Sequence, residues 1–280
     1  MPNELPIHVV IPDTQIKPGV PTAHLRWIGQ YLVDHFAGRP NVKVIHLGDH
    51  ADMPSLSSYD RGKKAMEGRR YLDDVAAANE GWATLNAAMV RYNRHRKTKW
   101  WPERHVLLGN HEDRITRAAE DDAQLEGVLS LESLDYSKSG WLVHPYLQPL
   151  FLDGIGYAHF WQNPMTGHPY GGTSLYRLKT LGHSFTQGHQ QTLDYAVRFT
   201  TDTSTGEPQS QHGLIAGACY LHDEDYKGYQ GNAHWRGIIV KHQVVKGSYN
   251  AMFVDLDYLC QRYEDTTLRD FRKALGYGRP

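Results

Sequence analysis

The chain has 280 residues, 40% hydrophobic and 11% aromatic, and its formal net charge at pH 7 is −1. This composition indicates a folded protein with a large core; it excludes a disordered or fibrous chain and lacks the positive field of a DNA-coating protein. Cys219 and Cys260 show no disulfide or metal-binding spacing, and the sequence predicts neither a signal peptide nor a membrane-spanning run, so we expect a cytoplasmic protein without a membrane partner.

Short apolar runs alternate with helical patterns in the first half of the chain. Apolar residues recur at helical spacing over 22–36, and an alanine-rich stretch predicts one or two long helices over 71–93, within a helical insertion at about 60–100. The apolar, β-branched runs predict three buried strands, at 7–12, 42–47 and 105–108, which end at Asp13, Asp49 and Asn110.

The second half is predicted to be richer in strands. Residues 151–160 form a predicted strand with His159 near its end, and residues 184–187 form another that leads into Gly188–His189. We interpret 201–211 as an exposed loop and the acidic run 222–226 as a loop as well. An antiparallel sheet is expected at about 214–264, and we treat 1–280 as one domain with an α/β fold.

Each of five predicted strands thus delivers a polar side chain where it ends. Taken singly, such a residue is more often a helix cap or a hydrogen-bonded structural group than a ligand. Ligands in open α/β sheets bind beyond the carboxyl ends of the strands, so the five together predict one shared site. They are Asp13, Asp49, Asn110, His159 and His189.

The motifs at these positions resemble those of the calcineurin-like metallophosphoesterase superfamily, in the style of its phage-encoded members. They are Asp13–Thr–Gln15, Gly48–Asp–His–Ala–Asp52, Gly109–Asn–His–Glu112, His159 and Gly188–His–Gln–Gln191. The resemblance covers about the first two thirds of the chain. It implies two facing mixed β-sheets flanked by helices, with the site at one edge of the sandwich, and a host cytoplasmic location if the chain is phage-encoded.

The resemblance also implies a role for each residue. Asp49 would bridge two divalent metal ions that share a hydroxide and hydrolyse a phosphate ester. The first ion would be bound by Asp13, Gln15 and Gln191, and the second by Asn110, His159 and His189. His111 would stabilise the transition state or protonate the leaving oxygen, and Asp52 would orient it, although Asp52 read alone is equally an N-cap.

Two glutamines depart from the superfamily pattern, which usually has histidine at the positions of Gln15 and Gln191. Both belong to the first metal site, which would then be rich in oxygen ligands. Such a site suits Mn²⁺, the metal we expect, or Mg²⁺ better than Zn²⁺, and would bind its ion more weakly.

Some assignments have competitors. Gly182–His183 is a second Gly–His pair, but His183 closes a helical segment, which is an ordinary structural position for histidine. His144 and His168 compete with His159; the first precedes a proline and the second lies in a Gly/Pro-rich segment.

The substrate is expected to be a phosphate ester, with nucleotides or nucleic acid favoured. Basic clusters at 61–70 and 91–99, the latter followed by two tryptophans, could track a nucleic-acid backbone, but solvated helix faces explain them slightly better. Arg114 is the better candidate for phosphate contact because it closely follows the Gly–Asn–His–Glu motif.

Two other functions remain open. A phosphomonoesterase or serine/threonine protein phosphatase would share the motifs, but those protein phosphatases have Arg–Gly after the second aspartate, where this chain has Met53–Pro54. A non-catalytic scaffold with a degraded metal site would explain the two glutamines. His111 and Asp52 argue against it, because a scaffold has no need for this pair.

Overall fold

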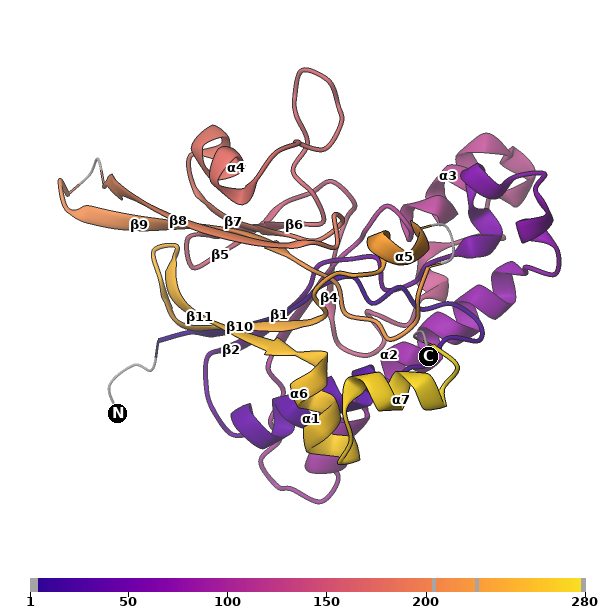
Figure 1. The fold of residues 1–280 in the computed structure, drawn as a ribbon, viewed down its shortest axis with the longest axis horizontal. Helices are drawn as coiled ribbons and strands as arrows, with labels where there is room; N and C mark the ends of the chain where they lie inside the picture. Colours follow the sequence, from indigo (N-terminus) through magenta and orange to yellow (C-terminus); the bar gives the residue numbers. More distant parts are fainter. Residues whose placement is uncertain (1–4, 203–204, 225–226, 278–280) are drawn as a thin grey trace.

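Two mixed β-sheets face each other at the centre of the structure, and helices cover their outer faces (Figure 1). The structure is a computed structural model, and it describes residues 5–202, 205–224 and 227–277. The α/β sandwich predicted from the sequence is therefore confirmed.

The first sheet has six strands in the order β11-β10-β1-β2-β3-β4. Its strands are β1 (Ile7–Ile11), β2 (Val42–His46), β3 (Glu103–Leu107), β4 (Leu142–His144), β10 (Gly237–Val245) and β11 (Ser248–Asp255). Strands β1 to β4 run parallel, whereas β10 pairs antiparallel with both β1 and β11. The carboxyl ends of β1, β2 and β3 consequently lie at one edge.

The second sheet has five strands in the order β5-β6-β7-β9-β8. These are β5 (Leu150–Leu152), β6 (Ile155–Ala158), β7 (Ser184–Gln187), β8 (Leu193–Thr201) and β9 (Pro208–Ala216). Strands β6, β7 and β9 are parallel neighbours, while β5 and β8 pair antiparallel at the two edges.

The helices are α1 (Ala23–Phe36), α2 (Tyr71–Asn93), α3 (Asp113–Asp121), α4 (Ser174–Leu181), α5 (Gly228–Gly231), α6 (Leu256–Glu264) and α7 (Leu268–Ala274). Short 3-10 turns are η1 (Pro54–Leu56), η2 (Ser58–Asp60), η3 (Lys64–Met66), η4 (Ala123–Leu125) and η5 (Leu131–Ser133). Helices α1 and α2 pack together, α6 packs on α1, and α4 packs on β8 and β9. No helix in the described ranges is both long and apolar enough to cross a membrane.

Burial along β1 explains the layers. All five residues of β1 are buried, with Ile7, Val9 and Ile11 in the cluster that includes α1 and α2, and Val10 in the cluster between the sheets. Successive side chains of a strand point to opposite faces, so a strand covered on both sides is mostly apolar; the exception in β1 is His8, which is buried and hydrogen-bonded to Tyr157 and Asp153. The continuous apolar runs of the sequence therefore mark the strands of a sandwich interior.

Three of the segments expected from the sequence, 151–160, 201–211 and 214–264, were wrong in their bounds. The expected strand 151–160 is two strands, because Asp153 and Gly154 turn the chain between β5 and β6, and Gly154 has a φ of +84°. The expected loop 201–211 contains the start of β9, since residues 208–211 pair with β8.

The expected antiparallel sheet at about 214–264 is also not one unit. Residues 214–216 end β9 in the second sheet, β10 and β11 extend the first sheet, and 256–264 form α6, whose N-cap is the side chain of Asp255. The antiparallel pairing of β10 with β11 agrees with the prediction.

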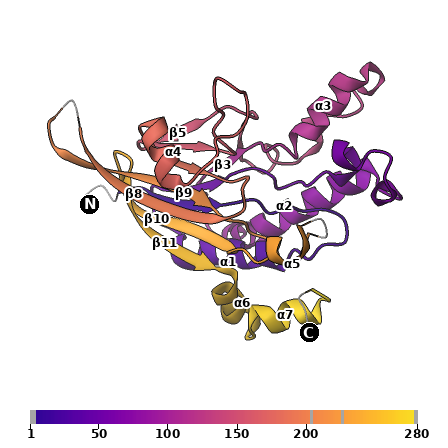
Figure 2. The ribbon, with the colours of Figure 1, turned by 45° about the horizontal axis from the view of Figure 1, so that its top comes forward.

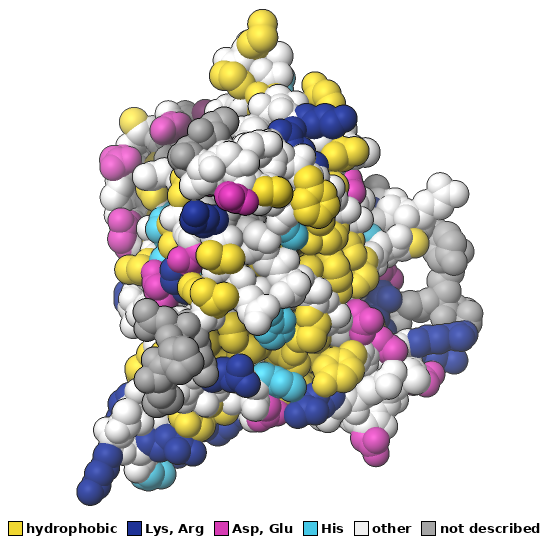
Figure 3. Space-filling view, turned by 90° about the vertical axis from the view of Figure 1, so that its left-hand side faces the viewer, with side chains coloured by type: hydrophobic (Ala, Val, Ile, Leu, Met, Phe, Trp, Pro, Cys, Tyr) yellow, Lys and Arg dark blue, Asp and Glu magenta, His cyan; other side chains and the backbone are white. Residues whose placement is uncertain are grey.

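The loops that follow the parallel strands lie between the sheets and the end of the molecule that carries α3 and α5 (Figure 2). Figure 3 views the opposite end, where hydrophobic side chains are exposed among polar ones. The predicted ligands lie in the loops that follow the parallel strands, so they lie toward the end of the molecule that carries α3 and α5.

Candidate metal centre

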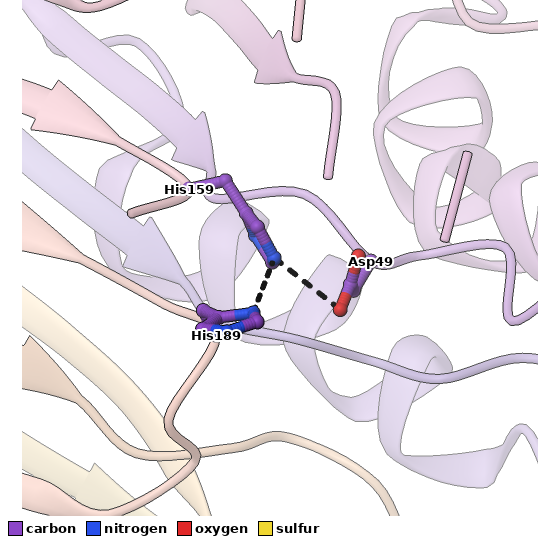
Figure 4. A group of neighbouring side chains, drawn as sticks. All are labelled: Asp49, His159 and His189. Atoms are coloured by element: carbon purple, nitrogen blue, oxygen red, sulfur yellow. Dashed lines mark hydrogen bonds and ion pairs between the residues drawn. The ribbon is translucent and has the colours of Figure 1, made fainter. Parts of the chain in front are cut away.

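Four side chains from four different strand ends converge at this edge. The Asn110 Oδ1 lies 2.9 Å from His159 Nε2 and 2.9 Å from His189 Nδ1, and the two histidine nitrogens are 3.3 Å apart. The Asp49 Oδ2 is 3.3 Å from His159 Nε2, and Asp49, His159 and His189 form a group that could hold a metal ion (Figure 4).

The spacing of these atoms fits one divalent cation. Ligand atoms that surround a cation at about 2.0–2.2 Å lie about 3.0–3.5 Å from one another. The four separations, 2.9 to 3.3 Å, are close to that range. One carboxylate, one amide oxygen and two imidazoles also form a usual ligand set for a divalent transition metal.

Hydrogen bonding orients Nε2 of His159 toward the cluster. Its Nδ1–H donates to the Leu47 carbonyl at 2.8 Å, so the lone pair on Nε2 faces the cluster. Burial lowers the pKa of His159, but the carboxylates of Asp49 and Asp13 outweigh it and raise the pKa to about 9. Burial, followed by the charge of His159, lowers the pKa of His189 to about 4. The carboxylates at this site thus attract positive charge to the cluster.

Several predicted ligands have a left-handed backbone conformation that is uncommon for residues other than glycine. The φ angles are +48° for Gln15, +50° for Asp49, +67° for His189 and +59° for Gln191. Such conformations cost free energy and concentrate at functional sites. Their grouping here supports the assignment of this edge as the site.

Glycines beside the ligands allow the loops to approach closely. A Cβ on Gly109 would lie 2.1 Å from Asp49 Oδ1 and 2.5 Å from the Asp49 nitrogen, and a Cβ on Gly188 would lie 2.4 Å from Asp13 Oδ1. These two glycines are required by contact with the ligands rather than by their own φ angles. The Gly–Asn and Gly–His pairs of the sequence therefore have a physical reason.

Glu112 holds together the loop that follows β2 and the loop that follows β3. Its carboxylate accepts hydrogen bonds from the backbone nitrogens of Asp49 (3.0 Å), His50 (2.7 Å), Ala51 (3.0 Å) and Gly109 (2.9 Å), and from the Tyr136 hydroxyl (3.1 Å). Glu112 is fully buried. The sequence motif includes this glutamate, but sequence reasoning assigned it no role; the bonds identify a positioning residue.

The three residues expected at the first metal position also lie together. Asp13 Oδ1 accepts from the His189 backbone nitrogen at 3.1 Å, and the Gln191 amide nitrogen lies 3.4 Å from Asp13 Oδ2. The Gln15 amide nitrogen donates to Asp49 Oδ2 at 3.2 Å. Burial, together with the charge of Asp49, raises the pKa of Asp13 to about 6. All seven predicted ligands are therefore adjacent, but both glutamines direct N–H groups to the carboxylates.

His111 and Asp52 form the expected pair. His111 Nδ1 donates to Asp52 Oδ1 at 2.6 Å, and His111 Nε2 lies 3.8 Å from Asp49 Oδ2. Burial lowers the pKa of His111, but Asp49 and Asp52 outweigh it, so the pKa is above the ordinary value. Arg114 donates to the backbone carbonyl of Asp52 at 2.8 Å and lies 3.2 Å from His111 Nε2. These three residues line one side of the cluster.

The alternative histidines lie elsewhere. His144 is 3.0 Å from His105, and His183 contacts the rings of Phe151 and Trp161. His168 is exposed in the segment between β6 and α4. None of these three histidines belongs to the group that contains His159 and His189, the two histidines preferred in the sequence analysis.

Sequence reasoning missed a set of charged residues beside Asp52. Lys17 donates to Asp52 Oδ2 at 3.0 Å and to the buried Glu224, whose carboxylate also bonds to His222 at 2.9 Å. Glu224 lies in the run 222–226 that was interpreted as a loop; residues 225 and 226 are outside the described residues. The position of Lys17, two residues after Gln15, was the only available signal, because Glu224 reaches the site from a distant part of the chain.

No protein-family model matches this chain, and no curated protein matches it either. A functional assignment consequently depends on the residues and geometry of this site.

Proposed function

We propose that this chain is a metal-dependent phosphoesterase, with a phosphodiester of a nucleotide or nucleic acid as the preferred substrate class. The observation that carries the proposal is the convergence of Asp49, Asn110, His159 and His189 beside the His111–Asp52 pair. The first four residues fit a divalent cation, and the last two fit acid–base work on a substrate next to it.

When bound, a divalent cation such as Mn²⁺ supplies Lewis acidity and lowers the pKa of water. The chain's own residues do the rest. The Leu47 carbonyl fixes the ring of His159, and Glu112 fixes the backbone of Asp49, so the ligands are preorganised. Preorganised ligands hold the reacting groups without rearrangement during the reaction.

His111 is the residue we assign to proton transfer. Asp52 accepts from its Nδ1, which leaves Nε2 as the atom directed to the cluster, and the raised pKa favours the protonated form that can donate to a leaving oxygen. The Arg114 guanidinium lies 3.2 Å from the same Nε2 and also donates, so the protonated form of His111 requires a phosphate oxygen that replaces this contact and accepts from both groups. The proposed acid, His111, and the proposed anion-binding group, Arg114, thus lie side by side next to the cluster.

The test is hydrolysis of bis-p-nitrophenyl phosphate and p-nitrophenyl phosphate with added Mn²⁺. We expect His111→Gln to lower the rate by about 10²-fold or more and Asp49→Asn to lower both the rate and Mn²⁺ binding. The matched control is His183→Gln, which removes a histidine outside the site and should leave the rate unchanged.

Absence of hydrolysis with every divalent cation, or equal rates in wild type and His111→Gln, would refute the proposal. The ratio of diester to monoester rates from the same assay decides the substrate class. A ratio well below one would favour a phosphomonoesterase over a phosphodiesterase or nuclease.

A further inference from the structure

An ammonium group binds the side chain of Gln191, one of the residues predicted at the first metal position. Lys227, at the start of α5, donates through Nζ to the Gln191 side-chain oxygen and to the Tyr220 hydroxyl, the latter at 3.1 Å. Its charge lies over the Tyr220 ring at 5.7 Å from the centroid. A cation of the protein therefore binds the one oxygen that Gln191 could offer to a first metal ion.

This contact fixes the orientation of Gln191. An ammonium carries donors only, and the Tyr220 hydroxyl also donates to Gln191 Oε1, at 2.8 Å. The amide must therefore present its oxygen to Lys227 and its nitrogen to Asp13, from which it is 3.4 Å away. In this arrangement Gln191 offers no oxygen to a metal ion near Asp13.

Gln15 likewise directs its amide nitrogen to a carboxylate, that of Asp49. Its amide nitrogen donates to Asp49 Oδ2 at 3.2 Å. The amides of Gln15 and Gln191 thus direct N–H donors to Asp49 and Asp13. Lys227 binds the oxygen of Gln191, and Lys17 is bound to Asp52 and Glu224. Donors stabilise carboxylates as a cation would, but they do not ligate a metal. The second position, lined by Asn110, His159 and His189, has no such group in its ligand set.

We propose that Lys227 occupies the oxygen that Gln191 would offer to a first metal ion, so that the chain binds a single divalent cation, at Asp49, Asn110, His159 and His189. This inference rests on the proposed metal centre and narrows it from two ions to one. It also replaces the expectation that the glutamines make a weak first metal site. The two amides instead donate hydrogen bonds to Asp49 and Asp13.

The test counts Mn²⁺ ions in the purified full chain by elemental analysis after equilibrium dialysis, with electron paramagnetic resonance on the same samples. We expect one Mn²⁺ per wild-type chain and the spectrum of an isolated ion. Lys227→Glu removes the ammonium from the Gln191 oxygen and adds a carboxylate beside it, so this variant should bind two ions. It should also show the spectrum of a coupled pair, because ions that share Asp49 lie about 3.5–4 Å apart.

Two variants serve as controls. Lys227→Arg keeps the positive charge and should remain at one ion. Lys179→Glu makes the same charge reversal on the exposed face of α4 and should also remain at one ion. The thermal midpoint of each variant reports folding, and the wild-type count stands even if Lys227→Glu fails to fold.

Two coupled ions in the wild type, or one isolated ion in a folded Lys227→Glu, would overturn the inference. Two ions in a wild type that hydrolyses the diester would leave the proposed function intact and remove only the role of Lys227. A wild type that binds no Mn²⁺ and hydrolyses neither substrate would remove the proposed function and the inference together.

Discussion

Substitution of Glu112 by glutamine should destabilise the loops that hold the site. Glu112 Oε2 accepts from the backbone nitrogens of Asp49 and Gly109, while Oε1 accepts from those of His50 and Ala51. Glutamine keeps only one oxygen, so two buried N–H groups would face an amide nitrogen. Each buried donor without an acceptor costs about 1–3 kcal/mol, which gives about 2–6 kcal/mol for the two.

Part of this cost is offset. Burial and the charge of Asp49 raise the pKa of Glu112, which shows that the buried charge itself is unfavourable, and glutamine removes it. We therefore expect a net loss near the lower end, about 2 kcal/mol, together with weaker Mn²⁺ binding because the backbone of Asp49 loses an anchor.

Urea denaturation followed by circular dichroism measures the change, and calorimetric titration with Mn²⁺ measures the binding. The matched control is Glu120→Gln on the exposed face of α3, which should change stability by less than about 0.5 kcal/mol. A Glu112→Gln protein with unchanged stability and unchanged Mn²⁺ affinity would refute the assignment of Glu112 as the anchor.

Two further outcomes follow from the same geometry. Gly109→Ala places a Cβ 2.1 Å from Asp49 Oδ1, so Mn²⁺ affinity should fall at least about 10-fold by calorimetric titration, whereas Gly171→Ala, which meets nothing within 4 Å, should leave it unchanged. The hydrogen bond from His8 is the main cause that lowers the pKa of Asp153 to about 2. The stabilisation from ionised Asp153 is present above the unfolded pKa of about 3.9 and is lost as pH falls through about 2. The difference in urea midpoint between wild type and Asp153→Asn should therefore shrink over that interval. A constant difference would contradict this.

The half of the site with the proposed metal ligands was predictable because its signals are local. Asp49 and Asn110 each follow an apolar strand, and parallel neighbouring strands end at the same edge of a sheet. The same reasoning placed His189 after β7, in the facing sheet. Short apolar runs that end on a polar residue therefore carried both the strand positions and the ligands.

The strand boundaries were less predictable where turns are short. Asp153–Gly154 separates β5 from β6 with no break in the apolar pattern, and Ser/Thr-rich residues occupy the hairpin of β8 and β9. Helix α6 follows β11 without a connecting segment, so the change from strand to helix at Leu256 left no loop composition to detect. These features depend on tertiary packing more than on local propensity.

The charged side of the site was not predictable, because its contacts join residues far apart in the chain. Lys17 meets Glu224, 207 positions later, and Lys227 meets Gln191 across 36 positions. From the sequence, Gln15 and Gln191 indicated only weaker ligands for a first metal ion. In the structure, the same two amides are donors to Asp13 and Asp49, and an ammonium binds the oxygen of Gln191. The proposed asymmetry of the centre thus follows from donors and acceptors: two imidazoles and an amide oxygen suit a metal ion at one position, whereas Lys227 binds the Gln191 oxygen that the other position would need.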